Sequence, residues 1–144
     1  MQKKYSLCLK IKVMCLTDKN PKFYVRLNQI ELANEKNQFN GYPTFGANTL
    51  EVIFLNKSDS DTKIDKDGKI IEDLSVIIDT LTVDGIDISN NCKQYGIYTT
   101  QNNTVENTYG FLHKNGVFCY NFITPIFYHL RNKNLIHNIE IQHT

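Results

Sequence analysis

The chain has 144 residues, and its 16 basic and 15 acidic side chains leave a formal charge of +1. This length suits one domain and is enough to bury a hydrophobic core without disulfides or metal ions. The balanced charge, spread without a basic face, argues against nucleic acid and against a membrane surface as partners. No stretch of the sequence is long and apolar enough to predict a membrane-spanning helix.

The first part of the chain alternates apolar and polar residues with a period of two, which is typical of strands with one buried face. We expect strands over 5–16, 23–32 and 49–56. The segment 33–48 between the last two holds an Asn-Gly pair and Pro43, so it predicts a loop or a weakly paired edge strand.

The stretch 69–83 is rich in β-branched residues and lies between two tight-turn signals, Asp67-Gly68 and Asp84-Gly85. This combination favours strands over a helix. Later strands are expected over three segments: 95–98, 109–112 and 117–123.

The last two of these segments flank Asn115-Gly116, which predicts a hairpin between them. Residues 126–130 could form a helical turn or a final short strand, and the alternating tail over 134–142 could pair as an edge. About eight to ten strands with little helix predict an all-β fold. We therefore expect residues 1–144 to form a single antiparallel β-sandwich of the jelly-roll type, with no internal repeat and no linker.

One polar loop is dense in carboxylates, the hard oxygen ligands that calcium prefers. An EF-hand is excluded, because Lys63 and Leu74 stand where that motif needs acidic residues. Two alternatives stay open, an irregular calcium site in a β-loop or a solvated turn. The candidate metal ligands are Asp59, Asp61, Asp65 and Asp67.

Several tyrosines fall in or beside predicted loops, where an aromatic ring can stack on a sugar. The same rings could instead cap the core or contact another subunit. The candidate ligand-binding residues are Tyr42, Tyr95, Tyr98 and Tyr109.

Catalytic signals are weak in this sequence. The four histidines are dispersed, and no nucleophile elbow, phosphate-binding loop or zinc-protease motif occurs. We expect no enzyme. The four cysteines include no closely spaced pair, which argues against structural zinc and favours reduced thiols in a protein made in the cytoplasm.

Four segments carry a family resemblance: NTLEVIFLNKSDSDT, DGKIIEDLSVIIDTLTVDGIDIS, YGIY and NGVFCYNFITPIFYHLRNK. Together they resemble a small jelly-roll domain in proteins of tailed phages and other aquatic viruses. That domain is similar to the calcium-dependent carbohydrate-binding modules that bind xylan. The resemblance covers roughly residues 5–135.

The resemblance implies a non-enzymatic structural or adhesion component of a virus particle, such as a capsid decoration or part of a tail or fibre. Its partners would be other virion proteins or further copies of itself, and it would be made in the host cytoplasm and reside in the virion. The alternative is a calcium-dependent carbohydrate-binding module that recognises a cell-surface glycan. Calcium, held by the four loop aspartates, is then the one cofactor to consider.

Overall fold

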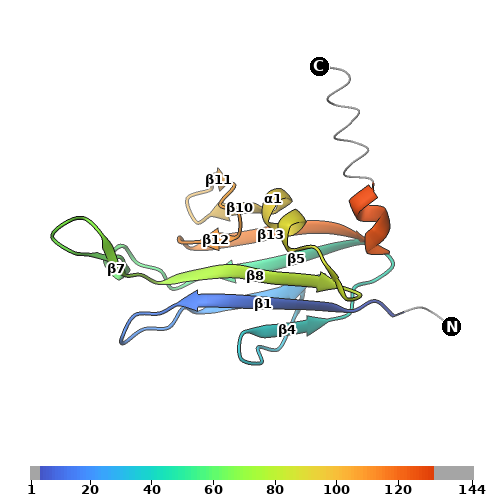
Figure 1. Cartoon of the computed structure of the whole chain (residues 1–144), viewed down its shortest axis with the longest axis horizontal. Coiled ribbons are helices and arrows are strands. Elements are labelled where there is room, and N and C mark those ends of the chain that lie inside the picture. The colour runs from blue at the N-terminus through green and yellow to red at the C-terminus, as the bar shows by residue number, and fades with distance from the viewer. Residues whose placement is uncertain (1–3, 132–144) are drawn as a thin grey trace, which may run out of the picture.

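In the computed structural model, which describes residues 4–131, two antiparallel sheets pack face to face (Figure 1). The predicted all-β sandwich is therefore confirmed. The first sheet has the order β12–β8–β1–β4, with β9 paired to β8 beside this path. Its strands are β1 (Leu7–Met14), β4 (Gln38–Gly41), β8 (Ser75–Val83), β9 (Ile86–Asp87) and β12 (Phe111–Leu112).

The second sheet has the order β11–β10–β13–β5–β2–β3. Its longest pairing joins β13 to β5, in a register that runs from Gly116 opposite Phe54 to Thr124 opposite Gly46. The strands are β2 (Phe23–Leu27), β3 (Ile30–Glu31), β5 (Gly46–Phe54), β10 (Ile97–Thr100), β11 (Val105–Glu106) and β13 (Gly116–Thr124).

A small hairpin of β6 (Lys63–Ile64) and β7 (Ile70–Glu72) belongs to neither sheet and extends beyond one end of the sandwich (Figure 1). A 3-10 turn, η1 (Asp59–Asp61), precedes it. The helix α1 (Ser89–Tyr95) lies between β9 and β10, and residues 126–131 are helical. No helix within residues 4–131 is long and apolar enough to cross a membrane.

The core lies between the sheets and is built from the alternating apolar positions of the strands. On β1 the buried side chains are Leu7, Leu9 and Ile11, as the period-two pattern predicts. On β8 both Ile78 and Leu81 are fully buried, although they are three residues apart. A register shift against β1, between Lys10 and Ile11, inserts an extra residue in β8 and moves the buried positions to the other phase of the strand.

The turn at Asp84-Gly85 confirms the hairpin that its sequence predicts. Both residues have positive φ, 51° and 78°, which is the geometry of a type I′ turn between β8 and β9. The segment 38–41 confirms the edge-strand alternative, since β4 pairs only with β1 in the described part of the chain.

The hairpin predicted around Asn115-Gly116 is wrong. β12 pairs with β8 in the first sheet, and β13 pairs with β10 and β5 in the second, so the turn carries the chain across the sandwich. The helical alternative for residues 126–130 is confirmed. Helix α1 was not expected, because its seven residues are too few to show a clear helical period. The predicted edge over 134–142 lies outside the described residues.

Candidate functional site

Three strands of the second sheet end side by side, and this brings three distant loops together. Phe54 at the end of β5 faces Gly116 at the start of β13, and Gly116 faces Thr100 at the end of β10. The loops that follow β5 and β10 and the turn that precedes β13 therefore emerge at one end of the sandwich.

These loops enclose a pocket of about 540 Å³, which we call the end pocket. All of its lining residues are polar or charged, and most can both donate and accept hydrogen bonds. They are Lys57, Ser58, Asp59, Thr62, Thr100, Gln101, Asn102, Thr104, Glu106, His113, Lys114 and Asn115.

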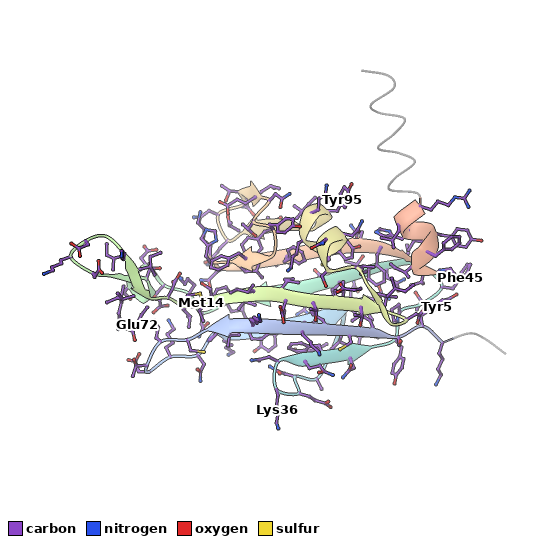
Figure 2. The ribbon with its side chains drawn as sticks, viewed as in Figure 1. Tyr5, Met14, Lys36, Phe45, Glu72 and Tyr95 are labelled. Atoms are coloured by element: carbon purple, nitrogen blue, oxygen red, sulfur yellow. The ribbon has the colours of Figure 1, made fainter. Side chains whose placement is uncertain are left out.

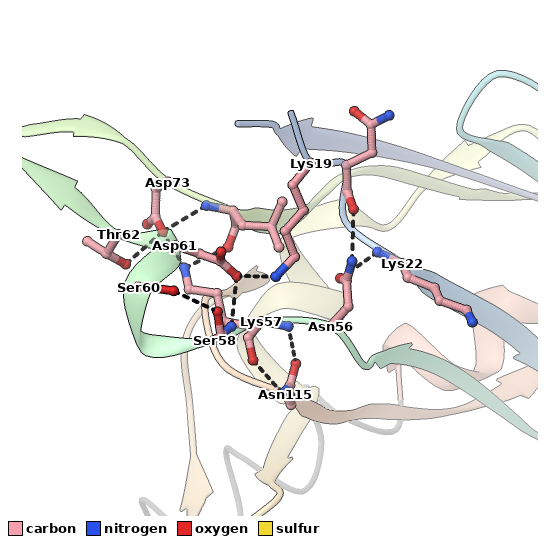
Figure 3. Close-up of polar contacts among 12 residues, drawn as sticks. Lys19, Lys22, Asn56, Lys57, Ser58, Ser60, Asp61, Thr62, Asp73 and Asn115 are labelled. Carbon is pink, nitrogen blue, oxygen red and sulfur yellow. Dashed lines mark hydrogen bonds and ion pairs between the residues drawn. The ribbon is translucent and has the colours of Figure 1, made fainter. Parts of the chain in front are cut away.

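Asn115 ties the three loops to one another. Its side-chain oxygen accepts from the Lys57 backbone N–H at 2.7 Å, and its amide nitrogen donates to the Lys57 carbonyl at 2.8 Å (Figure 3). Its own carbonyl accepts from the Gln101 N–H at 2.9 Å. The walls of the end pocket are thus joined by hydrogen bonds before any ligand binds, which reduces the entropy that binding would have to offset.

The side chain of Lys57 passes beneath the pocket, where it is only 10% exposed. Its ammonium group forms an ion pair with Asp73 and donates to the Leu74 carbonyl at 2.7 Å (Figure 3). The Asp73 carboxylate also accepts from Thr62 Oγ1 at 2.9 Å. Burial alone would raise the pKa of Asp73, but the hydrogen bonds from Lys57 and Thr62 hold it below its usual value.

Asp61, one of the four predicted calcium ligands, is engaged in a second ion pair. Its Oδ2 atom accepts from Lys19 Nζ at 2.6 Å and from the Ser58 backbone N–H at 2.8 Å (Figure 3). Burial would raise the pKa of this carboxyl, and the hydrogen bonds from Lys19 and Ser58 lower it below its usual value. Asp61 is therefore held as a carboxylate by an internal cation.

The other three predicted ligands lie on the surface of the same segment. Asp65 accepts from the backbone N–H groups of Asp67 and Lys69, both at 2.9 Å, which is the usual role of Asp in a turn. Asp59 and Asp67 are exposed. No three acidic, histidine or cysteine side chains within residues 4–131 come together to hold a metal ion. As the donor set stands, it does not fit calcium, which needs six to eight oxygens.

The four predicted sugar-stacking tyrosines are not brought together, and none lines the end pocket. Tyr42, with Lys4 Nζ 5.9 Å from its ring centre, and Tyr109 are exposed on loops, and Tyr95 projects from α1 (Figure 2). The ring of Tyr98 is fully buried, so it offers no face to a ligand.

Tyr98 nevertheless supports the pocket from below, because its hydroxyl donates to the Lys114 carbonyl in the wall. Burial, with a smaller contribution from Glu106, raises the pKa of this hydroxyl, which keeps it protonated and able to donate.

The charges around the end pocket largely compensate one another. Lys57 is paired with Asp73, and Lys114 Nζ lies 3.0 Å from Glu106 Oε1. Of the lining residues, Asp59 carries a carboxylate without an ion pair among the described residues. The pocket consequently offers hydrogen-bonding groups without a net positive field for an anionic ligand.

The sequence did not identify Gln101, Asn102, Lys114 or Asn115 as candidate ligand-binding residues. The available signal was two short polar stretches, QNNT and HKNG, which also read as ordinary surface loops. Only the strand register shows that both reach the loop after β5.

No protein-family profile and no curated protein sequence matches the chain. Two solved structures are similar to it. One is described as "vCBM60 in complex with galactobiose", with 15% identity, a TM-score of 0.47, and coverage of 80% of this chain and 96% of that one. The other is described as "Circular permutation provides an evolutionary link between two families of calcium-dependent carbohydrate binding modules. SeMet form of vCBM60", with 12% identity and a TM-score of 0.50. It covers 81% of this chain and 89% of that one, and at such identity the likeness shows a shared β-sandwich fold.

Proposed function

We propose that this chain is a glycan-binding module that binds a neutral sugar in the end pocket. The observation that carries the proposal is the lining of that pocket, which consists entirely of hydrogen-bonding side chains on three loops braced by Asn115. The volume of about 540 Å³ lies within the range of small-ligand sites. The fold shared with a protein described as a carbohydrate binding module supports the same proposal.

The chemistry of the lining favours sugars over other small molecules. Sugar hydroxyls both donate and accept, and the amides of Gln101 and Asn102 can match either role. The Thr62 hydroxyl donates its proton to Asp73 and can still accept from a sugar. Because the lysines of the pocket are paired with carboxylates, an acidic sugar would meet little compensating charge. A neutral glycan is therefore the expected class.

We further propose that this binding uses protein side chains directly and needs no calcium. Asp61 and Asp73, the two buried acidic side chains beside the pocket, are each paired with a lysine. A divalent ion would have to displace an ammonium group to reach either carboxylate.

A glycan array screened with the intact chain, followed by calorimetric titration of the best neutral oligosaccharide, tests the proposal. Gln101→Ala and Asn102→Ala remove exposed amides that make no hydrogen bond to any residue within 4–131, so they should leave the fold intact. Each should weaken binding by about tenfold, the effect of one lost hydrogen bond. The matched control is Asn90→Ala, an exposed position on α1 outside the pocket.

If the unchanged chain and the three variants bind the glycan with equal affinity, the glycan binds outside the end pocket. If the chain binds none of the neutral glycans, the proposed function is overturned. Incubation of the chain with its best oligosaccharide should release no new reducing ends, since we propose binding without cleavage.

A structural or adhesion role on a virus particle stays our prediction for the biological setting. A glycan-binding sandwich would suit adhesion, because it offers its recognition loops from a rigid scaffold. Mass spectrometry of particles purified from an infected culture should detect the chain in amounts that match the major structural proteins. Its absence from such particles would contradict this setting.

A further inference from the structure

A second cavity, of about 330 Å³, adjoins the end pocket, and we call it the sheet hollow. Three residues, Thr100, Gln101 and Asn115, line both cavities, so the two meet along a shared wall. A hydrogen bond within the chain holds this wall together, because the Gln101 N–H donates to the Asn115 carbonyl at 2.9 Å. A ligand that fills the end pocket can therefore continue into the sheet hollow without leaving the protein surface.

The strand register places the sheet hollow on the outer face of the second sheet. Val117 of β13 lies opposite Thr99 of β10 on one side and Ile53 of β5 on the other, and all three line the hollow. Their strand neighbours Phe118 and Val52 are buried between the sheets. Because successive side chains of a strand point to opposite faces, those of the first three residues point away from the core.

The lining of the sheet hollow differs from that of the end pocket. Ile53, Leu55 and Val117 contribute aliphatic groups, and the Leu55 side chain is 49% exposed. Gln101 and Asn103 add neutral amides, and none of the described residues that line the hollow is charged. A sugar unit combines an apolar face of C–H groups with hydroxyls that donate and accept, which matches this mixture of aliphatic and amide groups.

Two consecutive asparagines divide between the cavities. Asn102 lines the end pocket and Asn103 lines the sheet hollow, and both are exposed. They lie in one turn, which is closed where the Asn103 N–H donates to the Thr100 carbonyl at 2.9 Å. Because consecutive Cα atoms lie about 3.8 Å apart, one short ligand can reach the amides of both residues.

We propose that the sheet hollow is a second sugar subsite. The ligand is then a neutral oligosaccharide of at least two units, with one unit in the end pocket and the next beyond the shared wall. The hydroxyls of the first unit bond to the polar lining, and the C–H face of the second packs on Leu55 and Val117. This inference rests on the proposed function and extends it from a neutral sugar to a neutral oligosaccharide.

A nuclear magnetic resonance titration of the intact, isotope-labelled chain tests the second subsite. The probes are the neutral oligosaccharide selected on the glycan array and the monosaccharides from which it is built. The oligosaccharide should shift the backbone N–H signals of Leu55 and Val117 in the sheet hollow as well as those of Asn102 and Thr104 in the end pocket. It should bind about tenfold more tightly than its monosaccharides, because the second unit adds its own contacts.

Leu55→Thr reduces the aliphatic surface of the sheet hollow at an exposed position. It should weaken oligosaccharide binding about fivefold and leave monosaccharide binding in the end pocket unchanged. Ile97→Thr is the matched control, because Ile97 is 53% exposed on β10 of the same sheet and lines neither cavity. It should change neither affinity, and circular dichroism of both variants checks that the fold is kept.

The outcomes separate this inference from the proposed function. If the oligosaccharide shifts the signals of Asn102 and Thr104 but not those of Leu55 and Val117, the second subsite is overturned and the end pocket stands. Equal affinities of Leu55→Thr and Ile97→Thr for the oligosaccharide would overturn it as well. If only the sheet hollow responds, or if neither cavity does, both the second subsite and the proposed function are overturned.

Discussion

Replacing Lys57 by Met tests whether the ion pair beneath the end pocket supports the fold. The side chains of Lys57 and Asp73 are 10% and 9% exposed, so the substitution leaves a buried carboxylate without its cation. Removing one partner of a buried ion pair costs about 3–5 kcal/mol of unfolding free energy. Asp73 keeps its hydrogen bonds from Thr62 and from the Leu74 backbone N–H, which places the expected loss near the lower limit, at about 3 kcal/mol.

Urea unfolding followed by circular dichroism and tyrosine fluorescence measures this loss, since the chain has no tryptophan. The loss corresponds to a fall of about 10 °C in melting temperature for a chain of this size. Lys10→Met is the control, because Lys10 is exposed on β1 and the same change there should cost less than about 0.5 kcal/mol. Combining Lys57→Met with Asp73→Asn should restore part of the stability, because the buried charge is then gone.

The pH dependence provides an independent check on the same pair. The folded-state pKa of Asp73 lies below its usual value of 3.8, so the carboxylate stabilises the fold above pH 3.8 and this stability is lost as the pH falls through the lowered pKa. The difference between the unchanged chain and Lys57→Met should therefore shrink as the pH falls below about 4. A loss under about 1 kcal/mol, or one that is the same at pH 3 and pH 7, would refute the argument.

Three further predictions address the same end of the sandwich. Lys19→Met should lower the free energy of unfolding by about 1–2 kcal/mol in urea, less than Lys57→Met does, because the Lys19 side chain is 31% exposed and water can reach its ion pair with Asp61. A loss equal to or larger than that of Lys57→Met would contradict this ranking. Gly116→Ala should destabilise the chain by about 1–3 kcal/mol and weaken glycan binding, since its Cβ would lie 2.3 Å from the carbonyl oxygen of Thr99, the residue before Thr100 of the pocket lining. Chelation with EDTA should leave both the melting temperature and glycan affinity unchanged, whereas a clear fall in either would show that calcium is bound.

The sequence predicts the strands well where one face of a strand is buried and the other is exposed to solvent. The alternation in β1 and the Asp84-Gly85 turn are local signals, and local physics decides both outcomes. The phase change in β8 was not predictable in the same way. It depends on a bulge in β8 that forms where this strand pairs with Lys10 and Ile11 of β1. Because β1 lies more than 60 residues earlier in the sequence, the local pattern of β8 gives no sign of the bulge.

The same distinction separates the predicted site residues from those that form the end pocket. The sequence highlighted Asp61 and Tyr98 for their chemistry, as an oxygen ligand and as a stacking ring. In the fold each acts as a support, because Asp61 accepts from Lys19 and Tyr98 holds the Lys114 carbonyl from the core. A residue type states what a side chain can do, whereas its neighbours determine which of those roles is available.

Asn115 illustrates the point most clearly. Beside Gly116 it reads as an ordinary hairpin turn, and a hairpin would leave its amide in solvent. Because the chain instead crosses from the first sheet to the second at this turn, the amide meets the backbone of Lys57 and accepts and donates one hydrogen bond there. The departure from the local prediction is thus what creates the braced wall of the pocket. A site made by the meeting of three strand ends follows from topology, and topology is decided by long-range pairing that no single segment encodes.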